Sequence, residues 1–431
     1  MQDPARRTER HHDKKPNPTG DDRTPAQRDR DRILYSSSFR RLAEVTQVVS
    51  ANSGYVFHNR LTHSLQVAQV GRRLAEKLNK QFPESQDFVD PDVVEAACMA
   101  HDLGHPPFGH AAEHTLNDLA AEIGGFEGNA QSFRIVTRLA SRSPAYPGLD
   151  LTRATLAGIL KYPWLRGKNS DNPRKWGAYD SEADDFDFVS KLLAGVNQPT
   201  IEAQLMDWAD DITYSVHDLK DFFRAGRMPL HLFAAYKSRE QEQFFDSVFE
   251  RRKGDPAFAA QQDLKDAFLD MMIAYFPFST AYTGSASHRA LLRFATGQMI
   301  GRYINAARIQ IGSEGPKLII DPDLRIEVMM LKELTWTYVI EASSLAAQQH
   351  GRERIVAELF DIYSKAVSNE KQWSIFPMFY REKLHAEKKN VQELKRVPVD
   401  LIAGMTESQA VAMYHRLTGR SHDSGLEEIL P

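Results

Sequence analysis

The sequence predicts an all-α protein built as a helical array with short connections. Apolar residues recur at helical spacing along most of the chain up to residue 370, and no internal repeat is present. Only two short stretches, Lys317–Ile320 and Leu324–Val328, resemble strands. We therefore expect a helical bundle with additional C-terminal helices and at most a small β-hairpin.

Composition and charge indicate an ordinary globular protein. The chain has 431 residues, 42% hydrophobic and 26% charged, and its net charge of -4 does not suit a basic nucleic-acid binder. The single cysteine, Cys98, excludes internal disulfides and fits a reducing compartment. Because we find neither an apolar run long enough to span a membrane nor a signal-peptide pattern, we expect a cytoplasmic protein without a membrane partner.

The first elements are marked by capping residues and turn residues. Residues 1–24 carry too little apolar surface to order themselves, so we expect a disordered tail there. The Thr-Pro pair at 24–25 predicts a helix start, and apolar spacing predicts a helix over 29–49. An Asn-Ser-Gly turn signal predicts a short hairpin or loop over 48–57.

The later elements follow from the same spacing. An amphipathic helix is predicted over 59–78, and Asp90-Pro91 opens another that runs to Leu103. Residues 162–187 are rich in Pro, Gly, Asn, Asp and Trp, which indicates a long surface insertion. Further helices are predicted over 111–123, 131–139, 151–160 and 201–223, with a final helix pair over 397–418.

Two histidines lie on the apolar faces of separate predicted helices. His63 shares a stripe with apolar residues four, seven and eleven positions later. His101 follows apolar residues three, four and seven positions earlier, so both imidazoles point into the core. Asp102 comes directly after His101, and a carboxylate buried there is costly without a cation or hydrogen-bond donors.

A third predicted helix carries a polar line. Asp210, Tyr214 and Asp218 are spaced i, i+4 and i+8 on an otherwise apolar helix, which predicts a lined cavity. Two imidazoles and two carboxylates suit Mn, Mg, Fe, Co or Zn, whereas a single cysteine excludes a thiolate site. A lone core histidine is ordinarily satisfied by hydrogen bonds, and Asp210-Asp211 would ordinarily be a solvated face. The pattern alone leaves the metal site and these structural roles open.

The order His, then His-Asp, then Asp resembles the signature of the HD-domain phosphohydrolases. Longer motifs, spread over about residues 22–420, resemble the deoxyguanosine triphosphate triphosphohydrolase (dGTPase) family within that class. These motifs are FRRL at 39–42, TQV at 46–48, NRLTHS at 59–64, HDLGHPPFGH at 101–110, ADDITYS at 209–215 and IAGMTE at 402–407.

The resemblance implies an activity and a metal. Members of the family cleave a deoxynucleoside triphosphate at the α-phosphorus in one step, giving a deoxynucleoside and intact triphosphate. The ligands of the divalent metal would be His63, His101, Asp102 and Asp210, with manganese or magnesium expected in assays. Asp211 fits the fourth position less well, because Asp210 is the residue with a Tyr at i+4 and an Asp at i+8.

The resemblance also assigns catalytic and substrate-binding residues. His110 would protonate the leaving 5′-oxygen, Glu113 would hold His110, and His105 would donate to the phosphates. The substrate contacts would be Arg60 to the triphosphate, Gln47 and Asp218 to the sugar 3′-hydroxyl, Tyr214 beneath the sugar, where its bulk excludes a 2′-hydroxyl, and Asn129 in the pocket lining. Arg289 and Arg293 are candidates for contacting the base, and the base preference is open.

We expect three regions and several partners. Residues 1–24 would be the tail, 25–225 an HD phosphohydrolase core, and 226–431 a C-terminal helical region that completes the pocket and the oligomer interface. The resemblance implies a homo-oligomer, typically a hexamer built from dimers, with a deoxynucleotide activator at a subunit interface and single-stranded DNA as a further candidate partner. Control of nucleotide pools or restriction of phage would follow.

Two other functions stay open at this point. An HD-class phosphohydrolase acting on monophosphates or cyclic nucleotides would keep the metal chemistry, although Gln47, Tyr214 and Asp218 argue against it. A catalytically inactive regulator that binds nucleotides or single-stranded nucleic acid would be a different class of protein. The complete ligand set and the near-neutral charge both weaken that alternative.

Overall fold

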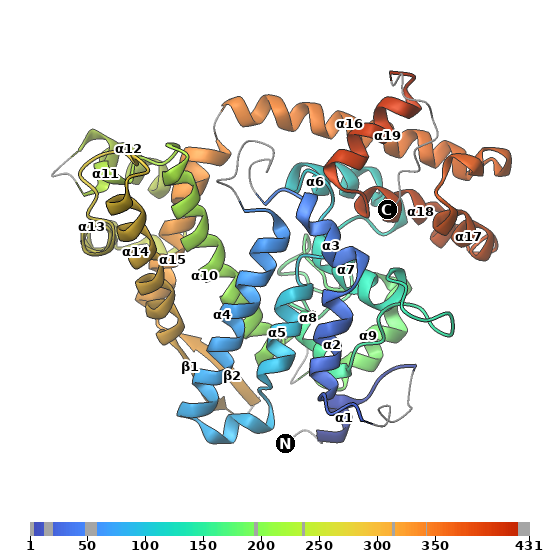
Figure 1. Cartoon of the computed structure of the whole chain (residues 1–431), viewed down its shortest axis with the longest axis horizontal. Coiled ribbons are helices and arrows are strands. Elements are labelled where there is room, and N and C mark those ends of the chain that lie inside the picture. The colour runs from blue at the N-terminus through green and yellow to red at the C-terminus, as the bar shows by residue number, and fades with distance from the viewer. Residues whose placement is uncertain are drawn as a thin grey trace.

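A computed structural model describes residues 4–12, 20–47, 58–193, 197–234, 238–312, 315–341 and 343–420. The predicted all-α fold is confirmed, because helices dominate the described chain and the sheet has two strands (Figure 1). The predicted hairpin or loop over 48–57 lies outside the described residues. Among the helices that the structure describes, none is both long and apolar enough to cross a membrane.

The small sheet corrects one of the two strand predictions. Strand β2 (Gly315–Ile320) contains the predicted strand and pairs antiparallel with β1 (Ala307–Gly312). The second predicted strand, Leu324–Val328, is wrong, because these residues lie inside helix α15 (Pro322–Thr335). Asp321 accepts hydrogen bonds from the first free amides of that helix, and Pro322 occupies its first turn.

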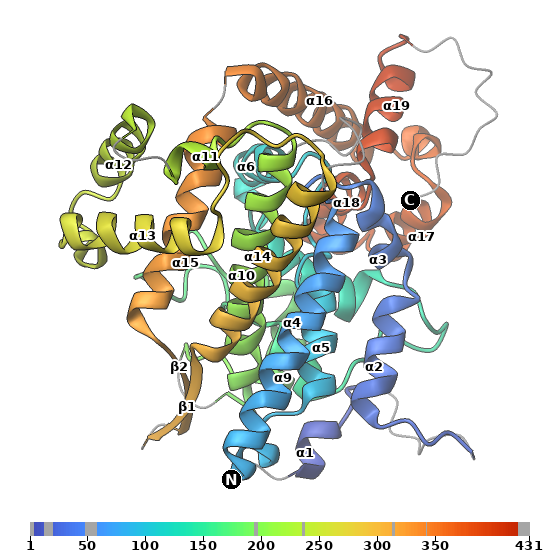
Figure 2. The same cartoon turned by 60° about the vertical axis from the view of Figure 1, so that its left-hand side comes forward.

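Three helices form the centre of the molecule. They are α4 (Arg60–Gln81), α5 (Pro91–Ala100) and α10 (Ile201–Arg224), which lie side by side in Figures 1 and 2. Each begins at a side-chain cap, from Asn59, Asp90 and Thr200 respectively. Their apolar faces share one hydrophobic cluster, so the polar residues carried on those faces are buried with it.

The other helices surround this centre. The α-helices are α1 (Pro4–Thr8), α2 (Pro25–Leu34), α3 (Ser37–Arg41), α6 (His110–Leu119), α7 (Gly128–Arg134), α8 (Arg153–Ile159), α9 (Ala183–Ser190), α11 (Leu230–Phe233), α12 (Arg239–Arg251), α13 (Gln261–Tyr275), α14 (Ala286–Asn305), α16 (Ser343–Val367), α17 (Met378–Ala386), α18 (Val391–Ala403) and α19 (Glu407–Leu417). Short 3₁₀ or π turns are η1 (Leu42–Glu44), η3 (Pro83–Asp87), η4 (Ala121–Ile123), η5 (Ile135–Leu139), η6 (Asp180–Glu182), η7 (Pro256–Phe258), η8 (Trp336–Ile340) and η9 (Glu370–Ile375).

Three sequence predictions differ from the structure in detail. The helix predicted over 29–49 is broken into α2, α3 and η1, because Ser36 caps a new helix. The helix predicted to reach Leu103 ends at Ala100. The segment 162–187 is not simply a surface insertion, because Trp176 and Tyr179 within it are only 3% exposed.

The N-terminal segment is also more ordered than predicted. Residues 4–8 form α1, and Arg10 is buried beyond it. The Arg10 guanidinium donates to Asp29 Oδ1 at 2.6 Å and to the carbonyl of Asp150 at 2.5 Å. A buried arginine with such partners fixes the segment to the core, so the prediction of a disordered tail is wrong for residues 4–12.

A second hydrophobic cluster packs the helices that Figure 1 shows at its upper right. It joins α6 to α16, α18 and α19 through residues such as Phe108, Leu116, Tyr363 and Ile402. Phe108, in the loop between α5 and α6, therefore packs with the C-terminal helices, whereas α4, α5 and α10 pack in the first cluster. The candidate site lies where elements of both clusters meet.

Candidate metal centre and active site

The first two predicted ligands face each other across α4 and α10. His63 is 3% exposed, and its Nε2 lies 3.0 Å from Asp210 Oδ1. Both residues occupy the positions that their apolar neighbours predict, one turn above Val67 and one turn below Met206. Asp211 points elsewhere and pairs with Lys332. The structure therefore brings Asp210, and not Asp211, to the buried histidine.

His101 and Asp102 join this pair from the end of α5. The Nδ1 of His101 lies 2.6 Å from the carbonyl oxygen of Cys98, so the Nδ1–H donates a hydrogen bond to it. That bond leaves Nε2 facing Asp102 Oδ1 at 3.5 Å and Asp210 Oδ1 at 3.7 Å, buried and without a hydrogen bond. A histidine whose other nitrogen donates to a carbonyl is the usual arrangement in protein metal ligands.

The charges at this cluster are arranged for a cation. Burial opposes ionisation of Asp102, but Arg60, His101 and His105 hold its pKa well below 3.8. Burial likewise opposes ionisation of Asp210, but His101 and His63 hold its pKa well below 3.8. Burial works to lower the pKa of His101, yet the two carboxylates raise it to about 9. Two ionised carboxylates therefore surround a nitrogen that holds a proton in the metal-free protein.

This donor set fits a divalent metal. Ligand atoms of His63, His101 and Asp102 lie within 4.8 Å of one another, and Asp210 contacts both imidazoles. Nitrogen and carboxylate oxygen together suit Mn, Fe, Co, Zn or Mg. A bound cation would replace the proton on His101 and would give its orphaned Nε2 a partner.

Arg60 is buried beside the cluster. Its side chain is 3% exposed, its Nη1 donates to Asp102 Oδ2 at 2.8 Å, and its Nε donates to the carbonyl of Thr46 at 3.1 Å. A surface arginine, which its sequence position alone would favour, is therefore excluded. The guanidinium offsets part of the negative charge of Asp102. It also lies close enough to contact a molecule bound at the same cluster.

The loop after α5 carries the predicted catalytic residues. His105 Nδ1 lies 3.0 Å from Asp102 Oδ1, and the His105 ring lies 5.9 Å from the His110 ring. Burial and Arg60 lower the pKa of His105, which favours its neutral form. Phe108 and Gly109 both adopt positive φ angles, of 69° and 64°, in the turn that leads into α6.

His110 and Glu113 form a pair on the first turn of α6. His110 Nδ1 lies 3.0 Å from Glu113 Oε2, while 72% of the His110 side chain is exposed. Burial opposes ionisation of Glu113, but His110, His105 and Lys175 lower its pKa. The ionised carboxylate orients the imidazole and leaves its Nε2 free to face solvent or a ligand.

The remaining predicted substrate contacts surround Arg60 and Asp210. Tyr214 and Asp218 follow Asp210 on α10, and Gln47 follows the Thr46 carbonyl that Arg60 contacts. Asp218 Oδ2 and Gln47 Oε1 are buried without hydrogen-bond partners. Burial, Asp221 and Asp210 raise the pKa of Asp218 well above 3.8, so this group suits a hydroxyl ligand.

Asn129 lies further from the metal cluster, at the start of α7. Its Nδ2 donates to Glu127 Oε1 at 2.9 Å, and Glu127 caps the helix. Glu127 also accepts from Lys175, which lies 3.6 Å from Glu113. Asn129 is thus linked to the His110–Glu113 pair through Lys175, and its role in the pocket lining stays a prediction.

Three lysines lie near the site. Lys175 and Lys332 were missed by the sequence analysis, and Lys161 belongs to a stretch, residues 161–163, that resembles the family but whose residues indicate no role. Lys161 pairs with Asp207, Lys175 contacts Glu113 and Glu127, and Lys332 pairs with Asp211 beside Tyr214. Lys175 belongs to the segment 162–187, which was predicted to be a surface insertion, and Lys161 directly precedes that segment. Its aromatic residues, including the buried Trp176, were the signal that it packs inward.

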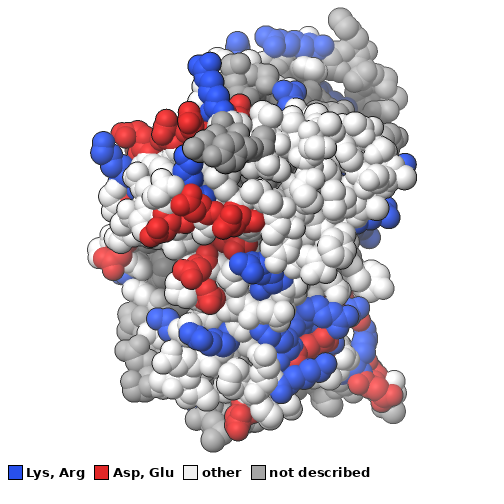
Figure 3. Space-filling view, turned by 90° about the vertical axis from the view of Figure 1, so that its left-hand side faces the viewer, with Lys and Arg blue, Asp and Glu red and all other residues white. Residues whose placement is uncertain are grey.

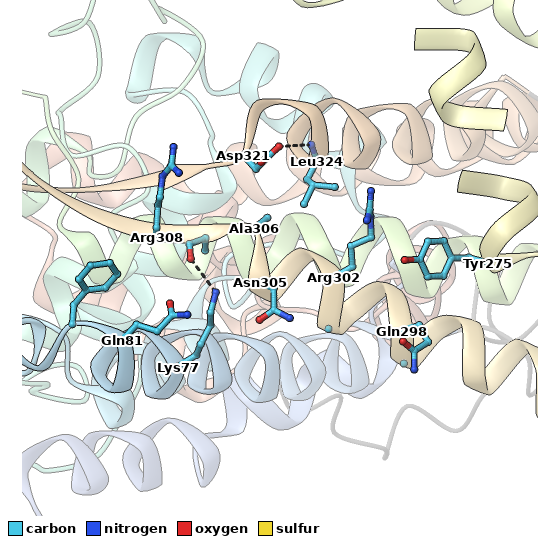
Figure 4. A pocket seen from close by; sticks show the side chains of 14 residues that line it. Lys77, Gln81, Tyr275, Gln298, Arg302, Asn305, Ala306, Arg308, Asp321 and Leu324 are labelled. Atoms are coloured by element: carbon cyan, nitrogen blue, oxygen red, sulfur yellow. Dashed lines mark hydrogen bonds between the residues drawn. The ribbon is translucent and has the colours of Figure 1, made fainter. Parts of the chain in front are cut away.

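Large grooves also lie elsewhere on the surface of the described residues. One of about 980 Å³ lies between the end of α4, α14 and the β-hairpin, and Figure 4 shows its lining. Lys77 in this groove donates to the carbonyls of Ile304 and Ala307, and Arg302 pairs with Glu327. Because Lys77 and Arg302 are already bonded and no histidine lines the groove among the residues that the structure describes, the groove does not rival the buried cluster as a catalytic site.

Fold and site together define an HD-domain phosphohydrolase. The HD domain model matches residues 60–215, which hold all four predicted ligands, and the phosphohydrolase-associated domain model matches residues 318–416. The chain belongs to the HD-domain family of deoxyguanosinetriphosphate triphosphohydrolase-like proteins.

Three relatives that carry this name illustrate the match. The Streptomyces coelicolor protein is 38% identical over 92% of this chain and 93% of its own length. The Corynebacterium efficiens protein is 36% identical over 93% of this chain and 92% of its own. The protein of Shewanella sp. strain ANA-3 is 30% identical over 97% of both chains. The likeness therefore extends over nearly the whole chain.

Proposed function

We propose that this protein hydrolyses deoxynucleoside triphosphates, in a metal-dependent reaction, to a deoxynucleoside and inorganic triphosphate. The observation that carries the proposal is the buried cluster of His63, His101, Asp102 and Asp210. Its donor set suits a divalent metal, and Arg60 stands directly beside it. The names of the relatives support a deoxynucleotide substrate.

The four predicted ligands would hold the ion. When bound, the metal would supply charge to polarise an α-phosphate oxygen and to lower the pKa of the attacking water. Water attacks the α-phosphorus, the bond from phosphorus to the 5′-oxygen breaks, and the deoxynucleoside leaves. His110 donates a proton to that 5′-oxygen, and Glu113 holds the imidazole in the orientation for this transfer.

The other side chains would bind the substrate. Arg60 would contact the triphosphate, and His105, whose side chain is 13% exposed, would donate a hydrogen bond to it. Gln47 and the carboxyl group of Asp218 would bind the sugar 3′-hydroxyl, since both present buried oxygens without partners. Tyr214 would lie beneath the sugar and leave no room for a 2′-hydroxyl.

The alternative of a nucleic-acid-binding regulator receives less support. On the face shown in Figure 3, Lys and Arg are interspersed with Asp and Glu, and a broad uncharged area lies between them. A protein that tracks a phosphate backbone presents a continuous basic groove, and the described residues on this face form none without Asp and Glu among them.

Product analysis tests the proposal. The four deoxynucleoside triphosphates and their ribose counterparts are incubated with the metal-loaded protein, singly and in mixtures, with manganese and with magnesium. We expect a deoxynucleoside and triphosphate in equal amounts, and no turnover of ribonucleotides. Release of orthophosphate, pyrophosphate or a monophosphate would contradict the proposal and favour another phosphohydrolase reaction. Mixtures are included because activation by one nucleotide would hide activity on another.

A further inference from the structure

The closing motif, residues 402–407, touches the candidate site in two places although it lies far away in the sequence. Arg41 is buried and donates to the Met405 carbonyl at 3.0 Å. The same guanidinium donates to the carbonyls of Leu103 at 2.7 Å and His105 at 2.8 Å, which belong to the catalytic loop. The motif is therefore connected to the loop through one arginine.

The second connection is made by Glu407, the first residue of α19. Its Oε1 accepts a hydrogen bond from the backbone amide of Thr46 at 3.0 Å, across 361 positions of sequence. Thr46 in turn offers its carbonyl to Arg60 Nε at 3.1 Å, and Arg60 Nη1 donates to Asp102 Oδ2 at 2.8 Å. An unbroken path of hydrogen bonds thus runs from Glu407 to a predicted metal ligand.

Thr46 also determines where Gln47 lies. Thr46 is 5% exposed and forms an isolated antiparallel bridge with Asn59, the residue that caps α4. Gln47 comes next and carries the buried, unpartnered Oε1 that the sugar would meet. Because the Thr46 amide donates to Glu407 and the Thr46 carbonyl accepts from Arg60, both backbone polar groups of this residue are bonded by side chains from other elements.

We propose that Glu407 is a positioning residue of the active site, which fixes the Thr46 backbone and so places the Gln47 amide for the sugar 3′-hydroxyl. This inference rests on the proposed function. Glu407 acts through Gln47 and Arg60 and does not touch the substrate itself. The closing motif would therefore serve substrate selection as well as packing, through a carboxylate that reaches the site from the C-terminal helices.

Three substitutions separate this role from a purely structural one. Glu407→Gln keeps an oxygen at the right reach, Glu407→Asp keeps the charge but is about 1.5 Å shorter, and Glu407→Ala removes both. If the carboxylate served only the helix dipole of α19, Asp would replace it and Gln would not, because the dipole responds to charge. If it holds the Thr46 amide, Gln would replace it and Asp would not.

The readout is the preference for a 3′-hydroxyl. We compare kcat/KM for one deoxynucleoside triphosphate and for its 2′,3′-dideoxy counterpart with the same base, and we record the Tm of each variant. The preference is the kcat/KM of the deoxynucleoside triphosphate divided by that of the dideoxy counterpart. We expect Glu407→Ala and Glu407→Asp to reduce this ratio by about three- to tenfold, the size of one lost hydrogen bond. Glu407→Gln should stay within about twofold of the wild type.

The outcomes separate the inference from the function on which it rests. The positioning role would be overturned if Glu407→Ala left the kcat/KM ratio unchanged. It would also be overturned if the ratio fell in Glu407→Gln but was retained in Glu407→Asp. In both cases the protein would remain a triphosphohydrolase. A wild-type protein that hydrolyses neither triphosphate would instead overturn the proposed function. If Glu407→Ala does not fold, the contrast between the Gln and Asp variants decides the matter.

Discussion

At the scale of single residues, the candidate site combines two kinds of histidine. His63 and His101 are buried among carboxylates and orient nitrogens toward one point, whereas His110 stands at the surface, where Glu113 holds it. The difference in burial matches the difference in proposed role. A ligand must be fixed in place, and a proton donor must meet the substrate and exchange its proton with water.

Replacement of His110 by asparagine tests the proton-donor role. We expect kcat to fall about 100-fold or more, because proton transfer to the leaving oxygen is lost, while KM changes little. The measurement is steady-state hydrolysis of a deoxynucleoside triphosphate. A matched substitution, Glu113→Gln, keeps an acceptor for the imidazole and should lower kcat less than His110→Asn does. Loss of less than about tenfold in His110→Asn would contradict the role.

At the scale of elements, the catalytic loop is held by close backbone contact. A Cβ on Gly104 would lie 2.1 Å from the carbonyl oxygen of Gly128 and 2.3 Å from the amide nitrogen of Ser132. The Gly104 amide also donates to Ser132 Oγ at 2.8 Å. Only glycine lets the loop between α5 and α6 pack so tightly on α7, and this contact sets the loop that carries His105 and His110.

Gly104→Ala therefore tests how the loop is positioned. The clash is with backbone atoms that cannot move aside, so we expect a loss of about 3 kcal/mol in unfolding free energy, together with reduced activity. Thermal and urea denaturation measure the change. Gly297→Ala is the control, because its Cβ would meet nothing within 4 Å and alanine favours a helix. Equal stability of the two variants would contradict the argument.

Much of this architecture was predictable because local signals are strong in helices. The helix starts at Thr24, Asn59 and Asp90 and the apolar stripes of α4 and α5 sufficed to place His63 and His101 on inward faces, whereas the set of four predicted ligands came from the family resemblance. The error over 324–328 was avoidable, because Asp321-Pro322 repeats the Asp-Pro helix start that was recognised at residues 90–91.

The rest of the site depends on tertiary contacts that no local pattern encodes. Lys332 meets Asp211 from α15, Lys175 meets Glu113 from an irregular segment, and Glu407 meets Thr46 from α19. A charged residue on a loop or helix surface is usually solvated, so sequence spacing could not single these out. Their partners became visible only when distant segments were brought together.

At the scale of the whole molecule, a buried ion cluster joins the C-terminal helices to the core. Arg134 on α7 is fully buried and donates to Asp400 on α18 at 3.0 and 2.9 Å. Glu182 and Glu393 also accept from it, and Lys383 donates to Asp400 at 3.0 Å. Because the second hydrophobic cluster contains Phe108, from the loop that carries the predicted catalytic residues, this ion cluster also helps to hold that loop in place relative to the core.

Asp400→Asn tests this connection. Burial opposes ionisation of Asp400, but Arg134 and Lys383 hold its pKa far below 3.8. The carboxylate therefore contributes stability that is complete above pH 3.8 and is lost as the pH falls below it. We expect the variant to lose about 3–5 kcal/mol of unfolding free energy near neutral pH, measured by urea denaturation, because Lys383 loses its carboxylate and Arg134 loses one of its three.

The pH series separates this effect from simple packing. The difference in unfolding free energy between the wild type and Asp400→Asn should be constant near neutral pH and should become smaller only below pH 3.8. Glu393→Gln is the control, because Glu393 is partly exposed and should cost less. A gap that is independent of pH throughout the acid range would contradict the electrostatic account.

The most direct test of the whole account is to measure manganese binding to the metal-free protein by calorimetry and by electron paramagnetic resonance. We predict one tight site per chain, with release of about one proton near neutral pH because His101 must lose its proton. That site should disappear in both Asp102→Ala and Asp210→Ala, while the Asp211→Ala variant retains it. Unchanged stoichiometry and affinity in the Asp102 and Asp210 variants would contradict a metal centre built from these helices.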